Sequence, residues 1–231
     1  MSIVKNNPGL KSPLQSLRRQ THALHKALEE TAVARALLST ELTLAQYAQV
    51  LAVWHAAWQR LEQGLFDSPF AKEVPHLLPF PRAQLAQGDL AYLDSIACAP
   101  DVHNLVQHAV TRSLDEMPAS LSGFIGMCYV LRGASLGGKV IAKHLNATLA
   151  LNDGKGTAFF NAESSDSLSW VQWMQRADQV LLSENDVDAA CRWACATFEL
   201  LLESFSGTND LATARLLRLG TAPGTDAKIG R

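Results

Sequence analysis

Apolar residues recur at helical spacing along almost the whole chain, and this periodicity constrains the fold more than any other feature of the sequence. No convincing run alternates apolar and polar residues with a period of two, as a half-buried strand requires. No internal repeat appears either. The sequence therefore predicts an all-α, single-domain protein of roughly seven or eight helices.

The composition suits a globular domain and argues against several function classes. Apolar residues make up 48% of the 231 residues and charged residues 18%, which is ample material for a core. The formal net charge of −2 gives no electrostatic basis for binding nucleic acid or an anionic membrane. The apolar runs are too interrupted for a membrane span, and the N-terminus lacks the apolar segment of a signal peptide. We therefore expect a cytoplasmic protein with no nucleic-acid or membrane partner.

Turn-forming residues divide the chain into a helical domain and two tails. A flexible tail is expected over residues 1–12, the helical domain over 13–207, and a flexible C-terminal segment over 208–231. Within the domain, helices are predicted over the ranges 13–38, 43–65, 82–96, 102–117, 119–149, 167–182 and 184–207. Thr43 with Gln46 predicts a capping box, and Asn185 or Asp186 is the expected N-cap of the last helix.

The cysteines and tryptophans are expected to be core residues. No C-x-x-C pair occurs, so a zinc ribbon or a thioredoxin-like site finds no support. Cys191 and Cys195 are one helical turn apart and could share a metal, but small buried thiols are the commoner case. The same expectation applies to the tryptophans Trp54, Trp58, Trp170, Trp173 and Trp193.

The segment "YVLRGASLGGKVIAKHL" has the apolar spacing of a helix but contains three glycines. Each interior glycine costs a helix about 1 kcal/mol relative to alanine. Gly133 and Gly137 lie on the same face, with Gly138 adjacent, so one side of the helix has almost no side chains. Such a face suits either close packing against another helix or the approach of a flat ligand to the backbone, with a break or bend near the glycines.

A second segment, "LRRQTHALHKALEE", carries the best candidate for a metal ligand. His25 and Glu29 are one turn apart on the same helical face. A metal-ligating histidine usually donates its other N–H to a carboxylate, a carbonyl or water. Arg18 and His22 lie along the same stripe, where they could meet acidic groups of a ligand. The alternative is that His25 and Glu29 form an ordinary surface pair.

Together, these two segments resemble the proximal and distal heme-gripping helices of heme oxygenases, with the bacterial biliverdin-producing branch the closer likeness. "LTLAQYAQVLAVWHAAWQRLE" resembles the second helix of that family, "RAQLAQGDLAYL" the helix after it, and "ACATFELLLESF" the closing helix. The resemblance implies a single-domain, multi-helix bundle of the heme oxygenase type, with a kinked, glycine-rich distal helix.

The resemblance also assigns roles to residues of this sequence. His25 corresponds to the proximal histidine that ligates the heme iron, and Glu29 to the carboxylate near its other nitrogen. Gly133, Gly137 and Gly138 match the distal glycines whose backbone nears the iron-bound oxygen. Four further residues correspond to groups that approach the heme propionates, namely Arg18, His22, Tyr129 and Arg176.

The implied activity is oxidative cleavage of heme to biliverdin, carbon monoxide and iron(II) with O₂. Heme is then both the substrate and the O₂-activating cofactor, and no protein side chain has to break a bond. A ferredoxin or a flavoprotein reductase would supply the electrons. A bacterial phytochrome that takes the biliverdin is a further partner that the resemblance allows.

Arg132 and Ala134 depart from the family pattern. Bacterial relatives commonly have an acidic residue before the first glycine and a serine after it, and the animal branch has an aspartate at the position of Ala134. Ser135 is turned away by about 100° on an ideal helix, so it replaces that group only if a kink rotates it. Arg132 is expected at the surface, or in contact with a propionate or a partner protein. Proton delivery is affected by these changes more than heme binding.

Two other function classes stay open at this point. One is a non-catalytic heme-binding or heme-trafficking protein of the same fold, which the departures at Arg132 and Ala134 motivate. The other is a helical enzyme of the same architecture with an unrelated ligand, such as a thiamin-salvage enzyme. Those enzymes rely on a cysteine nucleophile, and none of the cysteines here has a matching context.

Overall fold

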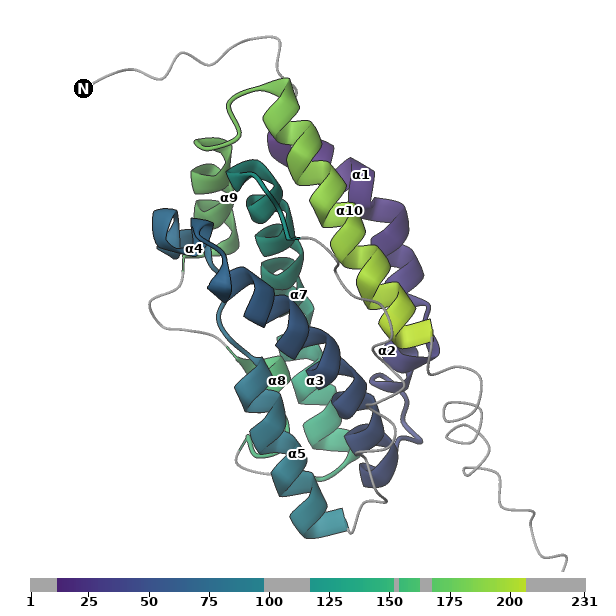
Figure 1. Cartoon of the computed structure of the whole chain (residues 1–231). Coiled ribbons are helices and arrows are strands. Elements are labelled where there is room, and N and C mark those ends of the chain that lie inside the picture. The colour runs from purple at the N-terminus through teal and green to yellow at the C-terminus, as the bar shows by residue number, and fades with distance from the viewer. Residues whose placement is uncertain (1–11, 98–116, 152–153, 163–167, 207–231) are drawn as a thin grey trace, which may run out of the picture.

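The structure is a computed structural model that describes residues 12–97, 117–151, 154–162 and 168–206 (Figure 1). No β-strand occurs within these ranges, so the all-α prediction is confirmed for them. The elements in chain order are α1 (Pro13–Glu29), α2 (Ala32–Ala36), α3 (Leu44–Asp67), α4 (Phe70–Glu73), the 3-10 turn η1 (Pro75–Leu77), α5 (Ala83–Ala97), α7 (Leu121–Thr148), α8 (Ala158–Asn161), α9 (Trp170–Asp178) and α10 (Glu184–Ser206).

Some predictions concern residues that the structure does not describe. The tail over 208–231, nearly all of the tail over 1–12, and the helix predicted over 102–117, apart from its last residue, lie outside the described ranges. Cys98 does so as well. The described thiols are free, with Cys128 and Cys191 buried and Cys195 partly buried, as core cysteines are.

Side-chain caps determine where two of the long helices begin. At α3, the Gln46 N–H donates to Thr43 Oγ1 at 3.3 Å and the Thr43 N–H donates to Gln46 Oε1 at 2.9 Å, which confirms the capping box. At α10 the expected cap at Asn185 or Asp186 is wrong, because Ser183 precedes the helix and caps it. The Asp186 N–H donates to the Ser183 hydroxyl at 3.2 Å, and the Asp186 carboxylate accepts the Ser183 N–H at 3.0 Å. Asp186 is therefore the acidic partner of an S-x-x-D box.

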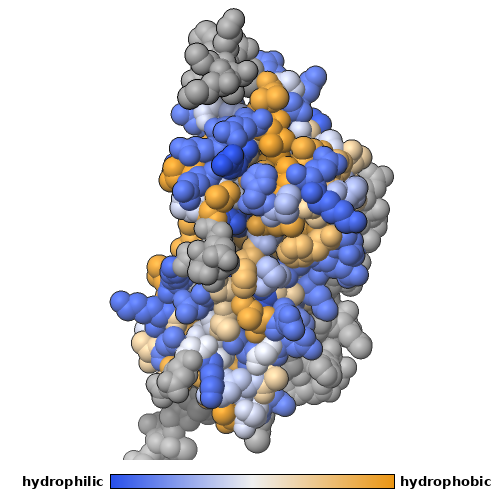
Figure 2. Space-filling model, turned by 90° about the vertical axis from the view of Figure 1, so that its left-hand side faces the viewer, coloured by the Kyte–Doolittle hydropathy of each residue, from blue (hydrophilic) through white to orange (hydrophobic). Residues whose placement is uncertain are grey.

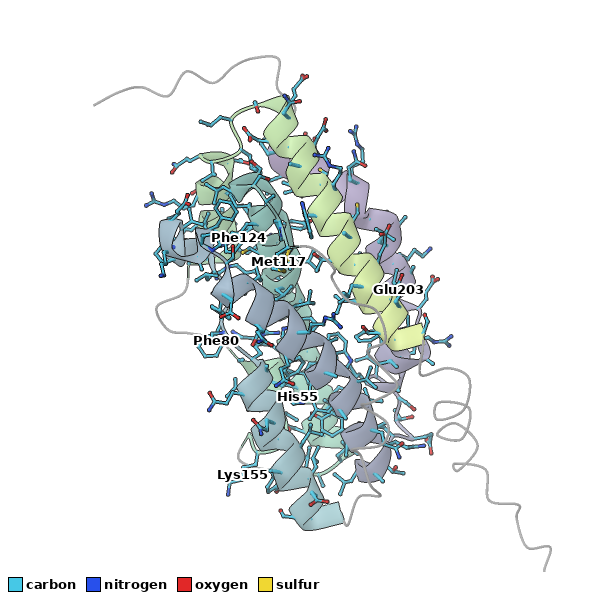
Figure 3. All side chains as sticks on the ribbon, in the orientation of Figure 1. His55, Phe80, Met117, Phe124, Lys155 and Glu203 are labelled. Atoms are coloured by element: carbon cyan, nitrogen blue, oxygen red, sulfur yellow. The ribbon has the colours of Figure 1, made fainter. Side chains whose placement is uncertain are left out.

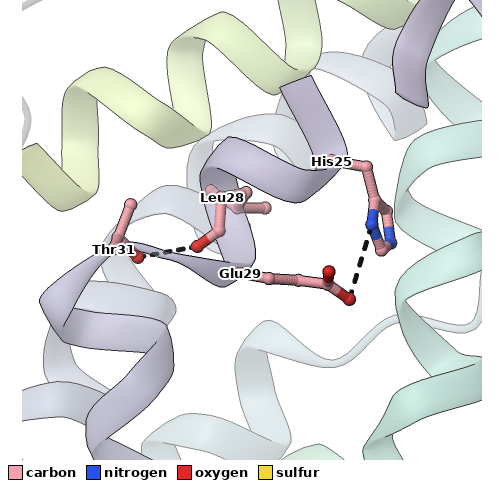
Figure 4. A network of polar contacts seen from close by, with 4 residues as sticks. All are labelled: His25, Leu28, Glu29 and Thr31. Carbon is pink, nitrogen blue, oxygen red and sulfur yellow. Dashed lines mark hydrogen bonds and ion pairs between the residues drawn. The ribbon is translucent and has the colours of Figure 1, made fainter. Parts of the chain in front are cut away.

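The helix predicted over 13–38 is two helices in the structure. The chain leaves α1 after Glu29 and enters α2 after Thr31. The Thr31 hydroxyl donates to the Leu28 carbonyl at 2.8 Å, as Figure 4 shows, and accepts the Ala34 N–H at 3.2 Å. Because these side-chain bonds compete with a continuous helical ladder, the turn falls directly after the stripe that carries His25.

α10 determines how α1 and α7 are placed relative to each other, because both helices pack extensively against it. α1 runs alongside α10 in Figure 1. Glycines let α7 approach α10 closely: a Cβ on Gly126 would overlap the Ala190 carbonyl, and one on Gly123 would lie 2.9 Å from Trp193 Nε1. α1 and α7 make few or no direct contacts with each other. Their separation is therefore determined by the helix that both contact.

α7 runs without interruption from Leu121 to Thr148, so the expected break at its glycines does not occur, and the expected bend stays a prediction. The reason is that glycine keeps its backbone N–H and C=O, so the helical hydrogen bonds continue through it. Gly138 faces α8, where an added Cβ would overlap the Phe160 carbonyl. Close packing, the first of the two expected uses of the glycines, therefore accounts for Gly138.

α7 is also the one helix of the described chain that is long and apolar enough to cross a membrane, judged by length and composition alone. Half of its most apolar window is buried inside the protein. A core helix of a globular domain passes the same test, so this single helix is weak evidence for a membrane span.

Two buried carboxylates connect α3, α5 and α8. Asp89 of α5 accepts the Phe159 N–H at 2.8 Å, at the start of α8. Glu62 of α3 accepts the N–H of Arg82 at 2.7 Å and that of Ala83 at 3.0 Å, at the start of α5. Burial raises the pKa of both carboxyls, and the N–H groups that they accept act in the opposite direction.

Candidate functional site

One exposed stripe of α1 carries most of the predicted ligand-binding side chains. Arg18, His22, His25 and Glu29 follow one another at intervals of three or four residues, and all of them are exposed. His25 Nδ1 lies 3.5 Å from Glu29 Oε1 (Figure 4), and the two side chains are 58% and 66% exposed. Because the carboxylate engages Nδ1, the other ring nitrogen, Nε2, is the one available to a metal.

The ring of Phe198 on α10 restrains the imidazole from a second direction. The two ring centroids are 5.7 Å apart with an interplanar angle of 69°, an edge-to-face arrangement. Phe198 is itself buried, so this contact rests on the core. Together with Glu29 it holds the His25 ring at the junction of α1 and α10. Sequence reasoning missed Phe198, because its only signal is a place on the apolar side of the last helix.

The surface of α7 around Gly133 and Gly137, which we call the bare face, is not explained by helix packing. A Cβ on Gly137 would meet nothing within 4 Å, and one on Gly133 would meet only the Trp170 ring, at 3.6 Å. The neighbouring side chains of Leu136 and Val140 are 58% and 67% exposed. The second expected use of the glycines, room for a flat ligand against the backbone, is the one that fits these two positions.

Tyr129 of α7 lies close to the stripe on α1. Burial raises the pKa of Tyr129, whereas a hydrogen bond with the Thr21 side chain and the positive charge of Arg18 act to lower it. Its ring centroid also lies 5.5 Å from that of Trp170. The structure therefore brings together Tyr129 and Arg18, two of the residues predicted to bind acidic groups, although they come from helices that hardly touch.

Three other predicted site residues lie elsewhere or are not brought into contact with this group. The Ser135 hydroxyl donates to the Arg132 carbonyl of its own helix, and its side chain lines a pocket along α7. Gly138 packs against α8, as described above. Arg176 is exposed on α9, a helix that contacts α1, and its role stays a prediction.

Arg132 has a structural role that neither expectation anticipated. Its guanidinium donates to the carbonyls of Leu78, at 3.4 Å, and Leu168, so it ties α7 to the loops that precede α5 and α9. It is therefore neither free at the surface nor directed to the bare face. Ala134 is partly buried against the core and offers no polar group that could organise water. Of the other histidines, His144 lies 3.3 Å from the Ser39 carbonyl through Nε2.

The donor set of this site is one imidazole backed by one carboxylate. Within the described residues, no group of three or more His, Cys, Asp or Glu side chains could hold a metal ion. A single imidazole suits a metal whose other ligands come from a bound macrocycle, as in heme proteins. The bare face, the exposed His25 and the cluster of Tyr129 with Arg18 together suit a flat ligand with acidic edges.

Three heme oxygenases of known structure are similar to this chain in fold. Heme oxygenase-2 from Synechocystis sp. PCC 6803, solved in complex with heme and NO, is 21% identical, with a TM-score of 0.63 over 92% of this chain and 94% of that chain. Heme oxygenase-1 from the same cyanobacterium, in complex with heme, is 17% identical, with a TM-score of 0.61 over 90% and 96%. Heme oxygenase from Leptospira interrogans is 20% identical, with a TM-score of 0.61 over 85% and 99%.

Sequence comparison identifies the family itself. A search of curated proteins finds no significant match. The sequence model of the heme oxygenase family, in contrast, matches residues 12–206, a span that contains every described residue. The long helices α1, α3, α5, α7 and α10 all lie within the matched residues. The chain therefore belongs to the heme oxygenase family.

Proposed function

We propose that this protein is a heme oxygenase in activity as well as in family, and that it cleaves heme to biliverdin, carbon monoxide and iron(II). Heme would bind between the stripe of α1 and the bare face of α7. The observation that carries the proposal is the pairing of an exposed, carboxylate-backed imidazole, His25, with the open space at Gly137. The heme complexes of the two Synechocystis structures support it.

The residues present fit heme. A flat macrocycle needs a surface without side chains, and Gly137 provides open space where a Cβ would stand. His25 would hold the iron through Nε2, because the Glu29 carboxylate lies beside Nδ1, at 3.5 Å. Its propionates need donors, which Arg18 and Tyr129 supply from the two helices. His22 and Arg176 complete the proposed set of propionate contacts.

Bound heme supplies the O₂ binding and redox chemistry, and the protein supplies position and access. His25 binds and orients the macrocycle, and the bare face leaves room above it. Ala134 offers no proton donor, and the Ser135 hydroxyl is engaged with the Arg132 carbonyl. We therefore propose that water at the bare face delivers protons. Electrons would come from a ferredoxin or a flavoprotein reductase in the cytoplasm, and biliverdin could pass to a phytochrome.

The test is a hemin titration followed by reduction in air. We expect one hemin per chain with a histidine-ligated Soret band, and conversion to biliverdin on addition of ascorbate or a reductase system. His25→Ala should lose the histidine-ligated spectrum and weaken hemin binding at least about tenfold. His76→Ala, which removes an exposed histidine from η1, is the matched control and should behave as the wild type. An unchanged spectrum in His25→Ala would show that the site assignment is wrong.

A second candidate function, heme binding or trafficking without catalysis, is favoured by Ala134 alone. Without a polar side chain at this position, the bare face lacks a group that could organise water. The same titration separates the two functions. A heme absorption spectrum that persists under reductant and air would favour the carrier, whereas its loss with the appearance of biliverdin absorption would favour the enzyme.

A further inference from the structure

A pocket of about 170 Å³ lies along α7 beside the bare face, since Leu136, a neighbour of the bare face, is part of its lining. It is formed by α7, the loop that precedes α5, and the start of α9. Three cationic side chains line it, those of Arg82, Arg132 and Lys139, and its described lining residues include no carboxylate. The described part of the lining is therefore biased toward positive charge.

Within the described residues, neither arginine forms an ion pair with a carboxylate. Arg132 donates to neutral backbone carbonyls, as described above. Its pKa is lowered by burial. A partly buried cation whose partners are neutral still carries a desolvation cost that an anion would offset.

The desolvation cost is larger for Arg82 than for Arg132, because Arg82 is only 3% exposed. Its guanidinium donates to the Ala162 carbonyl at 3.4 Å, a long hydrogen bond. The Glu62 carboxylate acts on it electrostatically, and the Phe159 ring centroid lies 5.9 Å from its guanidinium carbon. Burial lowers the pKa of Arg82 to about 10 in spite of Glu62. A bound anion would offset the cost of this buried charge.

The rest of the lining is apolar and aromatic. Phe80, 36% exposed, lies on the left-hand side of the view in Figure 3, the side that Figure 2 turns toward the viewer and shows as a mixture of apolar and hydrophilic surface. Trp170 forms another wall and is held in place by stacking on Trp173, with centroids 5.5 Å apart and an interplanar angle of 7°. Leu136 of α7 is also part of the lining. An inorganic anion would leave these surfaces uncovered.

We infer that this pocket binds a small amphipathic carboxylate, with its carboxylate on Arg82, Arg132 and Lys139 and its apolar body against Phe80 and Trp170. The planar guanidinium suits bidentate recognition of a carboxylate. The pocket volume suits a molecule of the size of benzoate. The pocket adjoins the proposed heme site, since Trp170 of its lining also stands 3.6 Å from the Cβ position of Gly133. Arg82, Arg132 and Lys139 are not among the residues proposed to hold heme.

Benzoate titrated into the heme-free wild-type protein by calorimetry tests this inference, with inorganic phosphate as the comparison anion. We expect one benzoate per chain with a Kd of about 1 mM or below, and weaker binding of phosphate. Lys139→Glu should weaken benzoate binding about tenfold or more, since it reverses a charge in the lining. Lys143→Glu makes the same change one turn further along α7, outside the lining, and should alter the Kd less than about twofold.

Several outcomes would overturn the inference. These are no heat of binding with benzoate, equal weakening by the two lysine variants, or phosphate binding as tight as benzoate binding. Displacement of benzoate by one equivalent of hemin would show that the pocket is part of the heme site. Since the titration uses heme-free protein and Lys139→Glu should leave the hemin Soret band unchanged, failure here is distinguishable from failure of the proposed function.

Discussion

At the residue scale, the glycines of α7 serve different purposes that depend on their neighbours. Gly126 and Gly138 allow backbone carbonyls of α10 and α8 to approach, whereas Gly137 faces open space. The sequence indicated that these glycines matter but could not separate the two uses, because adjacent helical positions point in different directions toward elements far away in the chain. The same limit applies to Arg132, whose carbonyl partners lie in two distant loops.

This difference predicts opposite effects of the same substitution at adjacent residues. Gly137→Ala should raise the free energy of unfolding of the heme-free protein by up to about 1 kcal/mol, because alanine has the higher helix propensity and its methyl group meets no atom. Gly138→Ala should lower the free energy of unfolding by about 1–3 kcal/mol, because its methyl group overlaps the Phe160 carbonyl.

Thermal and urea unfolding of the heme-free proteins measure both effects. The hemin affinity of Gly137→Ala should change in the opposite direction to its stability, because the added methyl group occupies the bare face. Gly137→Ala should therefore be more stable than the wild type and bind hemin more weakly. A variant that is destabilised, or that binds hemin as tightly as the wild type, would contradict the role given to the bare face.

At the element scale, side chains at helix ends determine the boundaries that periodicity alone misses. The capping box of Thr43 and Gln46 could be predicted because both partners are local in sequence. The break after Glu29 could not, since Leu28, Thr31 and Ala34 also fit a continuous amphipathic helix until the Thr31 side-chain bonds are known. α9 and α10 were likewise expected, with boundaries wrong by a few residues.

Two carboxylates that connect helix ends predict stability changes with opposite dependence on pH. Hydrogen bonds from Ser122, at 2.6 Å, and Ser183 lower the pKa of Asp186, so its contribution is present above its ordinary pKa and is lost as the pH falls through the lowered value. Burial raises the pKa of Asp89, so its contribution is present below its ordinary pKa and is lost as the pH rises through the raised value.

Asparagine substitutions at these positions isolate the two contributions. Asp186→Asn should cost about 1 kcal/mol at neutral pH, with the deficit shrinking as the pH falls. Asp89→Asn should show a deficit that grows as the pH falls. Urea unfolding of both variants and the wild type between about pH 3.5 and pH 7.5 measures the slopes. If the stability deficits of the two variants changed with pH in the same direction, that result would contradict the opposite directions given to the two pKa shifts.

At the scale of the whole molecule, the fold could be predicted and the site only in part. Periodicity and the order of motifs pointed to the all-α architecture, and the comparison with solved heme oxygenases agrees with it. His25 and Glu29 could be found because they are one turn apart. Phe198 and Trp170 could not be assigned, since their roles arise only when α10 and α9 pack beside α1 and α7.

The same architecture predicts that hemin stabilises the protein as a whole. A ligand that joins α1 and α7 adds contacts where the two helices make few or none of their own. With free hemin at about 100 times its Kd, the native state gains about 2.7 kcal/mol, which corresponds to a rise in Tm of roughly 5–10 °C for a chain of this size. Scanning calorimetry with and without hemin measures the shift. At the same hemin concentration, His25→Ala should lose about half of the shift or more, and an equal shift in that variant would contradict iron ligation by His25.

The position of α10 also affects how the family can vary. Since α1 and α7 meet through this third helix, the width of the space between them depends on Ala190 and Trp193, which lie against glycines of α7. Neither residue belongs to the group proposed to contact the ligand. Substitutions at these two positions can therefore change the affinity for a macrocycle without changing a residue that contacts it. Evolution could alter the affinity in this way while His25 and the bare face stay unchanged.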